Sequence, residues 1–211
     1  MNDGLAAEAV VFARANLPEA PARVLEIGAG DGALARALAG AGYSVVAIDP
    51  NPRGADVRAT SLHELDEPAA SFDAALAVWS LHHVRPLDES IRRLADLLAP
   101  GALLLVDEFD VDRLDRRAAA WWLEQRRARG ADAETTPERI VEEHRAHLHS
   151  LERIVQALEP HFDVGRPLRG AWLYRWDLDD SLRADEEELI AAGLLPAVGA
   201  RLVARRPSPP G

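Results

Sequence analysis

The sequence predicts an α/β fold in which helices flank both faces of a mostly parallel, seven-stranded sheet. Short apolar runs alternate with helical segments along most of its 211 residues, as in proteins built on parallel sheets. The run 102–106 is almost purely aliphatic, which is typical of a strand buried on both faces. The run 23–27 leads directly into a loop of alternating glycines. Together these observations indicate a Rossmann-like, doubly wound sheet.

The composition indicates a soluble globular protein, with 48% hydrophobic and 28% charged residues. We expect one domain over 1–211. The net charge of −11 disfavours binding to nucleic acid or to an anionic membrane surface. Because the chain has no cysteine, disulfides and thiolate zinc sites are excluded. There is no signal-peptide pattern and no apolar run that could span a bilayer. We therefore expect a cytoplasmic monomer or homodimer.

In the N-terminal half, hydrophobic runs and turn signals place the elements. Gly40 and Gly42 end the helix that follows the first strand. The turn 49–52, Asp-Pro-Asn-Pro, closes the second strand. We expect an N-terminal helix over 5–16 within the segment 1–20, strands over 23–27, 44–48, 56–59 and 72–79, and helices over 32–41 and 87–98.

In the C-terminal half, the charged segment 112–143 interrupts the alternation. It has a helical pattern and is too short to hold a core of its own, so we expect an inserted helical cap or lid over 112–150. The glutamates at 186–188 are interpreted as a solvated helix face. The remaining expected elements are a helix over 149–158 and candidate final strands over 162–164 together with 171–176, and then over 200–204.

The strongest chemical signal is the loop after the first strand. Glycines at 28, 30 and 32 let the chain turn sharply and let a ligand approach the backbone where a Cβ would collide. The helix that begins beyond Asp31 directs its free N–H groups into the same crevice. Asp49, at the tip of the second strand, is placed to accept the hydroxyls of a ribose. The pattern predicts a site for a nucleoside-bearing cofactor.

The glycines alone leave two cofactors open. Gly28, Gly30 and Ala33 also satisfy the dinucleotide fingerprint, with an acid at a suitable distance. Glu26, two residues before the first glycine, instead favours a cofactor that carries an ammonium group. A carboxylate at this position suits such a group and is unhelpful beside the pyrophosphate of a dinucleotide.

Four segments together resemble the class I S-adenosylmethionine-dependent methyltransferases. They are 24–38 with the glycine loop, 45–50 with the acid, 72–84 with Leu81-His82-His83, and 97–106. The resemblance extends in detail over 23–109. It implies a cofactor site formed by Glu26, Gly28, Ala29, Gly30, Gly32, Asp49, Pro50, Thr60, Ser61, Leu62 and Trp79. Thr60 or Ser61 stands where the family usually has an acid that binds the adenine amine.

Residues for catalysis and for the acceptor are less defined. His82 and His83 follow the fourth strand, and because adjacent side chains diverge, at most one of them is expected to act as a general base. Glu108, Trp122, His144 and His149 are candidates to line the acceptor site. No metal site is expected, since the spacing of the histidines at 144, 147 and 149 does not place all three on one helix face.

We therefore predict a methyltransferase that uses S-adenosyl-L-methionine and a small-molecule acceptor, with in-line methyl transfer. Two alternatives are kept. One is a non-catalytic cofactor-binding or regulatory protein. The other is an NAD(P)-dependent oxidoreductase, which the absence of lysine disfavours because a Tyr-x-x-x-Lys site cannot be formed. The acceptor atom, whether O, N, C or S, is left open.

Overall fold

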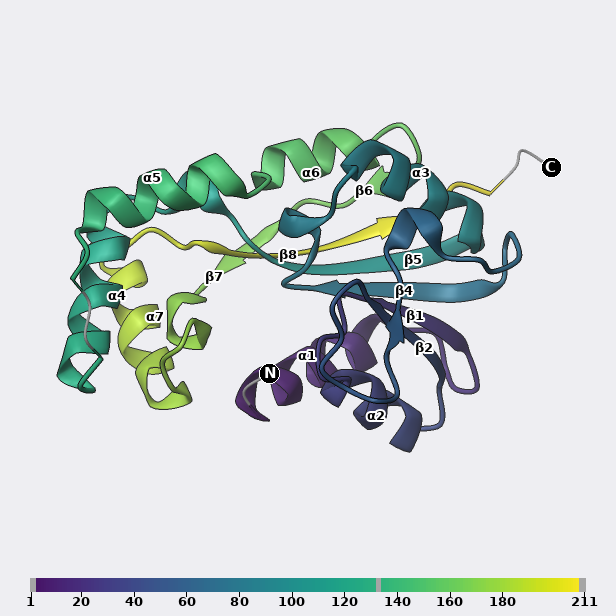
Figure 1. The fold of residues 1–211 in the computed structure, drawn as a ribbon, viewed down its shortest axis with the longest axis horizontal. Helices are drawn as coiled ribbons and strands as arrows, with labels where there is room; N and C mark the ends of the chain where they lie inside the picture. The colour runs from purple at the N-terminus through teal and green to yellow at the C-terminus, as the bar shows by residue number, and fades with distance from the viewer. Residues whose placement is uncertain (1–2, 132–133, 209–211) are drawn as a thin grey trace.

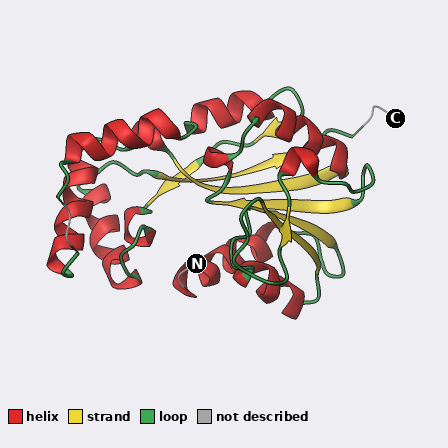
Figure 2. Ribbon diagram, viewed as in Figure 1, coloured by secondary structure: helices red, strands yellow, loops and turns green. Residues whose placement is uncertain are grey.

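A computed structural model describes residues 3–131 and 134–208 and shows a mixed sheet flanked by helices (Figures 1 and 2). The strands follow the order β3-β2-β1-β4-β5-β8-β6, and β7 also pairs with β8. The strands are β1 Arg23–Ile27, β2 Ser44–Asp49, β3 Arg58–Ala59, β4 Phe72–Val78, β5 Leu98–Phe109, β6 Asp163–Val164, β7 Leu168–Gly170 and β8 Gly199–Arg205. The helices are α1 Asp3–Asn16, α2 Ala33–Gly40, α3 Leu87–Leu97, α4 Arg116–Ala128, α5 Pro137–His147, α6 Leu151–Leu158 and α7 Arg183–Ala191.

Strands β1 to β5 are parallel, whereas β8 runs antiparallel to β5, β6 and β7. The chain order reverses between β1 and β4, since β2 and β3 lie on one side of β1 and β4 and β5 on the other. In open α/β sheets ligands bind outside the carboxyl ends of the strands at this reversal point. The expected Rossmann-like, mostly parallel sheet is confirmed, and it predicts the position of the site.

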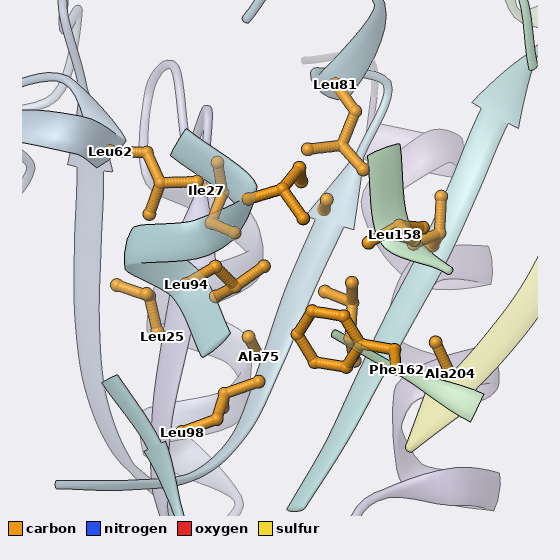
Figure 3. Close-up of a cluster of buried hydrophobic side chains, with 14 of the residues drawn as sticks. Leu25, Ile27, Leu62, Ala75, Leu81, Leu94, Leu98, Leu158, Phe162 and Ala204 are labelled. Atoms are coloured by element: carbon orange, nitrogen blue, oxygen red, sulfur yellow. The ribbon is translucent and has the colours of Figure 1, made fainter. Parts of the chain in front are cut away.

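Two apolar layers hold the helices on the sheet. Helices α3 and α6 cover one face and α1 and α2 the other (Figure 1). Figure 3 shows the first layer, in which Leu94 of α3 and Leu158 of α6 gather with Leu25, Ala75 and Ala204 from three strands. This packing fixes the strands whose ends carry the site.

A third cluster of buried side chains forms a separate lobe at one end of the sheet. It joins α4 and α5 to the short turn Leu173–Arg175 and to Leu178 and Leu182 before α7, and it is rich in aromatic rings. The expected cap segment 112–150 therefore contributes α4 and α5, while its residues 132–133 lie outside the described part of the chain. The lobe also includes a C-terminal segment that the sequence did not indicate.

The strand expected over 171–176 is wrong. The chain forms β7 earlier, at Leu168–Gly170, and then turns at 173–175. The cause is Glu186 of α7, whose carboxylate accepts the backbone N–H groups of Trp172, Leu173 and Tyr174 at 2.7, 3.0 and 2.9 Å. Glu186 is fully buried, so the interpretation of 186–188 as a solvated face is also wrong at this position.

Strand β5 is longer than expected because it continues through Pro100 and Gly101. Gly101 has a φ of +79°, and the register with β4 shifts between Phe72 and Ala74, which marks a bulge rather than the end of a strand.

In residues 3–131 and 134–208, no helix combines the length and the apolar character needed to cross a membrane.

Candidate functional site

A cavity of about 390 Å³ opens at the carboxyl ends of β1, β2 and β4. It brings together eight of the residues proposed from the sequence, which come from four separate segments of the chain. These eight are Gly28, Asp49, Pro50, Thr60, Ser61, Leu62, Trp79 and His83.

Of the glycine loop, Gly28 lines this cavity, whereas Ala29, Gly30 and Gly32 do not, and neither does the preceding Glu26. The N–H groups of Gly28 and Ala29 both donate to the carbonyl of Ile48, at 2.9 and 3.0 Å, so the loop is held against the end of β2. Gly28, Gly30 and Gly32 all have φ between +57° and +76°. A Cβ at Gly28 would lie 2.4 Å from the Cβ of Ser80. The absence of side chains is therefore required by both conformation and space.

We expect the substitution Gly28→Ala to destabilise the fold strongly. The new side chain has an unfavourable positive φ and collides with Ser80, and conformational strain alone costs about 1–3 kcal/mol. Thermal unfolding will show a clearly lower Tm. Gly40→Ala is the matched control, because a Cβ at the end of α2 meets no atom within 4 Å. Equal Tm values for the two variants would contradict the role given to Gly28.

Asp49 lies where the glycine loop meets the cavity. Its Oδ2 accepts the N–H of Gly30 at 3.0 Å and its Oδ1 accepts the N–H of Asn51 at 2.8 Å. A carboxylate has about four acceptor positions, so each oxygen keeps one for a ligand hydroxyl. Asp49 thus both fixes the loop and presents acceptors to the cavity.

Glu26 is buried in β1, directly before the glycine loop, and is only 2% exposed. Burial raises the pKa of its carboxyl to about 8, against the lowering effect of the Ala35 backbone N–H. Its Oε2 has no hydrogen-bond partner among the described residues. A buried carboxyl with an unpaired oxygen suits a ligand that brings a positive charge. The residues present therefore fit a cofactor that carries an ammonium group.

The turn that follows β4, residues 79–84, forms another wall and is called the post-β4 turn below. Trp79 has a φ of +53° and its ring meets Trp172 edge-on, with centroids 4.8 Å apart. Of the two adjacent histidines, His83 lines the cavity. Burial and the neighbouring His82 lower the pKa of His83.

His82 lies on the opposite side of this turn and is 1% exposed. Its Nδ1 is 2.5 Å from Oε2 of Glu108, and since a carboxylate accepts, Nδ1 carries the proton. His82 is therefore not placed to take a proton from an acceptor in the cavity. Of the two histidines, His83 is therefore the remaining candidate for a general base.

Two candidates for the acceptor site, Glu108 and Trp122, are instead buried. Glu108 is fully enclosed beneath the post-β4 turn, because its strand position directs it toward the backbone of Ser80 and Leu81. Trp122 stacks on Trp176 at 4.0 Å and donates its Nε1–H to the carbonyl of the same residue. Both side chains support the fold and do not line the cavity.

The other two candidates, His144 and His149, also lie outside the lining. His144 donates Nδ1–H to the carbonyl of Ile140 and meets the ring of Trp176 at 4.6 Å. His149 donates its backbone N–H to the carbonyl of His82 and its Nε2–H to that of Val84, each at 3.0 Å. His149 therefore anchors the post-β4 turn to the segment between α5 and α6.

The lining also contains residues that the sequence reasoning missed. Asn51, Arg85 and Ser90 contribute to the cavity, and the buried hydroxyl oxygen of Ser90 has no hydrogen-bond partner among the described residues. Asn51 follows Asp49 so closely that the turn pattern could have indicated it. No local signal points to Ser90, because only the packing of α3 beside β4 brings it to the cavity. Of the described residues, no three His, Asp or Glu side chains form a possible metal site.

Comparisons with known proteins agree with this geometry. A family model described as a methyltransferase domain matches residues 3–159. An uncharacterized methyltransferase of Mycobacterium bovis is 32% identical over 172 residues, covering 72% of this chain and 85% of that protein. The ubiquinone biosynthesis O-methyltransferase of Methylocella silvestris is 38% identical over 96 residues, which are 39% of this chain and 38% of that protein. The chain thus matches well under half of the latter's length.

A solved structure has the same fold across almost the whole chain. It is an S-adenosylmethionine-dependent methyltransferase from Mesorhizobium loti, with a TM-score of 0.63 and 22% identity, and the match covers 97% of this chain and 99% of that one. At this identity the likeness concerns the fold.

Proposed function

The chain belongs to the methyltransferase-domain family and is an S-adenosylmethionine-dependent methyltransferase, and from this premise we propose that it methylates a hydroxyl group of a small organic molecule. The family decides between the cofactors that the glycine loop alone leaves open. The choice of oxygen is supported by His83, a histidine at the cavity with a lowered pKa. It is also supported by the similarity to an O-methyltransferase of ubiquinone biosynthesis.

The cofactor supplies a methyl group activated on a sulfonium sulfur. On this proposal, Glu26 would bind the ammonium group of the cofactor and Asp49 its ribose hydroxyls. The backbone at Gly28 would lie next to the part of the cofactor that links these two groups. Thr60 and Ser61 would offer hydroxyl and backbone groups to the adenine. These contacts fix the direction from which an acceptor approaches, and alignment of this kind accounts for much of the rate in displacement reactions.

His83 would hold the proton that the acceptor hydroxyl loses. The imidazole is neutral near pH 7 because its pKa is lowered, so it is ready to accept a proton. Trp79 lines the same cavity as His83. The single observation that carries the proposal is that His83, whose pKa is lowered by burial, lines the proposed cofactor cavity.

We expect Asp49→Ala to weaken binding of S-adenosylhomocysteine more than tenfold, or about 1.4 kcal/mol. The substitution removes the acceptors for the ribose and also releases the N–H of Gly30. Isothermal titration calorimetry gives the Kd directly. Asp73→Ala is the control, since that aspartate of β4 accepts the Arg23 N–H at the opposite end of the sheet. An unchanged Kd in Asp49→Ala would remove its assigned role.

The proposed reaction is tested with a panel of small acceptors and purified protein. Phenols and catechols supply hydroxyl groups, anilines supply nitrogen and thiophenols supply sulfur, and release of S-adenosylhomocysteine is measured with mass detection of the product. We expect methylated hydroxyl compounds. Product formation only from amines or thiols would overturn the choice of oxygen, and absence of any methylated product across this panel and a metabolite extract would favour a binding or regulatory role.

A further inference from the structure

The post-β4 turn has a conformation that needs support. Trp79 occupies the left-handed region at φ +53°, where a residue with a Cβ is disfavoured. Ser80 follows with φ −139° and ψ −37°, and its buried hydroxyl has no partner among the described residues. Yet this turn carries Trp79 and His83 to the wall of the cofactor cavity. Contacts from elsewhere must therefore stabilise it.

The support comes from the end of the neighbouring strand β5. The Trp79 N–H donates to the carbonyl of Asp107 at 2.7 Å. The next two N–H groups, of Ser80 and Leu81, donate to Oε1 of Glu108 at 3.0 and 2.6 Å. Three successive amides of the turn thus converge on two residues of β5.

The second oxygen of Glu108 is also occupied. Oε2 accepts Nδ1–H of His82 at 2.5 Å and the N–H of Phe109 at 3.3 Å. The Glu108 and His82 side chains are 0% and 2% exposed, so these contacts are shielded from water. The ring of His82 lies 4.3 Å from that of His83, centroid to centroid. One buried carboxylate therefore binds both the backbone of the turn and the histidine next to the proposed base.

We propose that Glu108 is a positioning residue of the methyl-transfer site, which with His82 holds the post-β4 turn so that Trp79 and His83 face the cofactor cavity. The proposal rests on the proposed function for the role of His83, but the geometry of the turn does not depend on the acceptor. Two turn amides, the His82 ring and the Phe109 N–H converge on the two oxygens of Glu108, and a carboxylate has acceptor positions for all four. A glutamine would direct its NH₂ group at the Nδ1–H of His82.

The test uses S-adenosylhomocysteine as the probe, so that no acceptor is needed. We expect Glu108→Gln to raise the Kd of S-adenosylhomocysteine about tenfold, because it disturbs the buried hydrogen bond between His82 and residue 108. Glu108→Ala should raise it further, since the Ser80 and Leu81 N–H groups lose their acceptor. The matched control is Glu186→Gln, which alters a carboxylate that is equally buried and accepts three backbone N–H groups, but at a turn outside the cavity lining.

Two further measurements separate positioning from general stability. In proton NMR of the wild type, the Nδ1–H of His82 should give a strongly downfield resonance that Glu108→Gln removes and Glu186→Gln preserves. Hydrogen exchange at the Ser80 and Leu81 amides should accelerate in Glu108→Gln more than the global exchange rate does. A merely structural role would lower Tm without this local change.

The proposal is overturned if Glu108→Gln folds and keeps the wild-type Kd, or if Glu186→Gln raises the Kd equally at the same loss of Tm. If the Glu108 variants do not fold, His82→Asn and His82→Leu decide, because only asparagine keeps an N–H donor for Glu108. Equal affinities in these two variants would overturn the proposal. Failure of the acceptor panel alone, with the binding results as expected, would count against the proposed acceptor and leave Glu108 in its role.

Discussion

The substitution Glu26→Gln is expected to weaken binding of S-adenosylhomocysteine roughly a hundredfold while making the cofactor-free protein more stable. The carboxyl of Glu26 is 2% exposed, and one of its oxygens lacks a partner among the described residues. Removing one member of a buried ion pair costs about 3 kcal/mol, which gives the expected loss of affinity. Calorimetry measures the binding and chemical denaturation the stability.

The gain in stability follows from the sign of the pKa shift. Burial raises the pKa of Glu26 in the folded state to about 8, from an ordinary value of 4.5. The folded state therefore holds the proton of Glu26 more tightly than the unfolded chain does. The stability that this protonated carboxyl contributes is complete below pH 4.5 and is lost as the pH rises toward 8. Glutamine removes this loss. The free energy of unfolding of Glu26→Gln should exceed that of the wild type most at pH 8. A constant difference in this free energy between pH 5 and 8 would contradict the raised pKa of Glu26.

The same carboxyl should couple cofactor binding to proton release. Near pH 7 Glu26 is protonated in the free protein, and a bound ammonium group favours the ionised form. The wild-type affinity should therefore rise by up to about tenfold per pH unit from pH 6 toward 8. Glu26→Gln should lose this dependence. Calorimetry in two buffers of different ionisation enthalpy counts the released protons, and their absence in the wild type would show that Glu26 stays neutral in the complex.

The cofactor side of the site could be predicted because its signals are local in the chain. The glycines and the acid at the end of the second strand each follow directly from a strand, and the parallel sheet brings strand ends together. Gly28, Asp49 and Thr60 accordingly lie around one cavity. Here a residue's neighbours in sequence largely determine its place in space.

The acceptor side and the lobe could not be predicted in the same way. Asp107 and Glu108 are adjacent acids at the end of one strand, and only the pairing of β5 decides their directions. Asp107 binds Arg175 and Arg201, whereas Glu108 turns under the post-β4 turn. Glu186 likewise shapes a turn more than ten residues away. Buried carboxylates that bind distant backbone leave no periodic pattern in the sequence.

The turn after β4 connects the two sides of the site. Its backbone is bound by Glu108 from β5 and by His149 from the segment between α5 and α6, so two separate parts of the chain hold it. His83 therefore takes its position from two parts of the molecule. A change at either contact is therefore expected to move His83 relative to the cavity.

The substitution His83→Gln is expected to lower kcat by about 10²- to 10⁴-fold, the usual contribution of a general base. The Kd of S-adenosylhomocysteine should change little, because glutamine keeps a polar group of similar reach at the cavity wall. The rate is measured with saturating S-adenosylmethionine and the best acceptor of the panel. His161→Gln is the control, since that residue follows α6 and does not line the cavity.

The pH dependence identifies His83 more specifically than the loss of rate does. A base acts when it is deprotonated. Burial and His82 lower the pKa of His83 below its ordinary value of 6.5. Arg85 and His144 also lower this pKa, whereas Glu108 raises it. The wild-type kcat should therefore rise with pH and reach half of its plateau value below pH 6.5. In His83→Gln that rise should disappear, leaving a slow rate that increases only as the acceptor hydroxyl itself ionises. A variant that keeps both the wild-type kcat and the acidic limb would show that the acceptor loses its proton to another group.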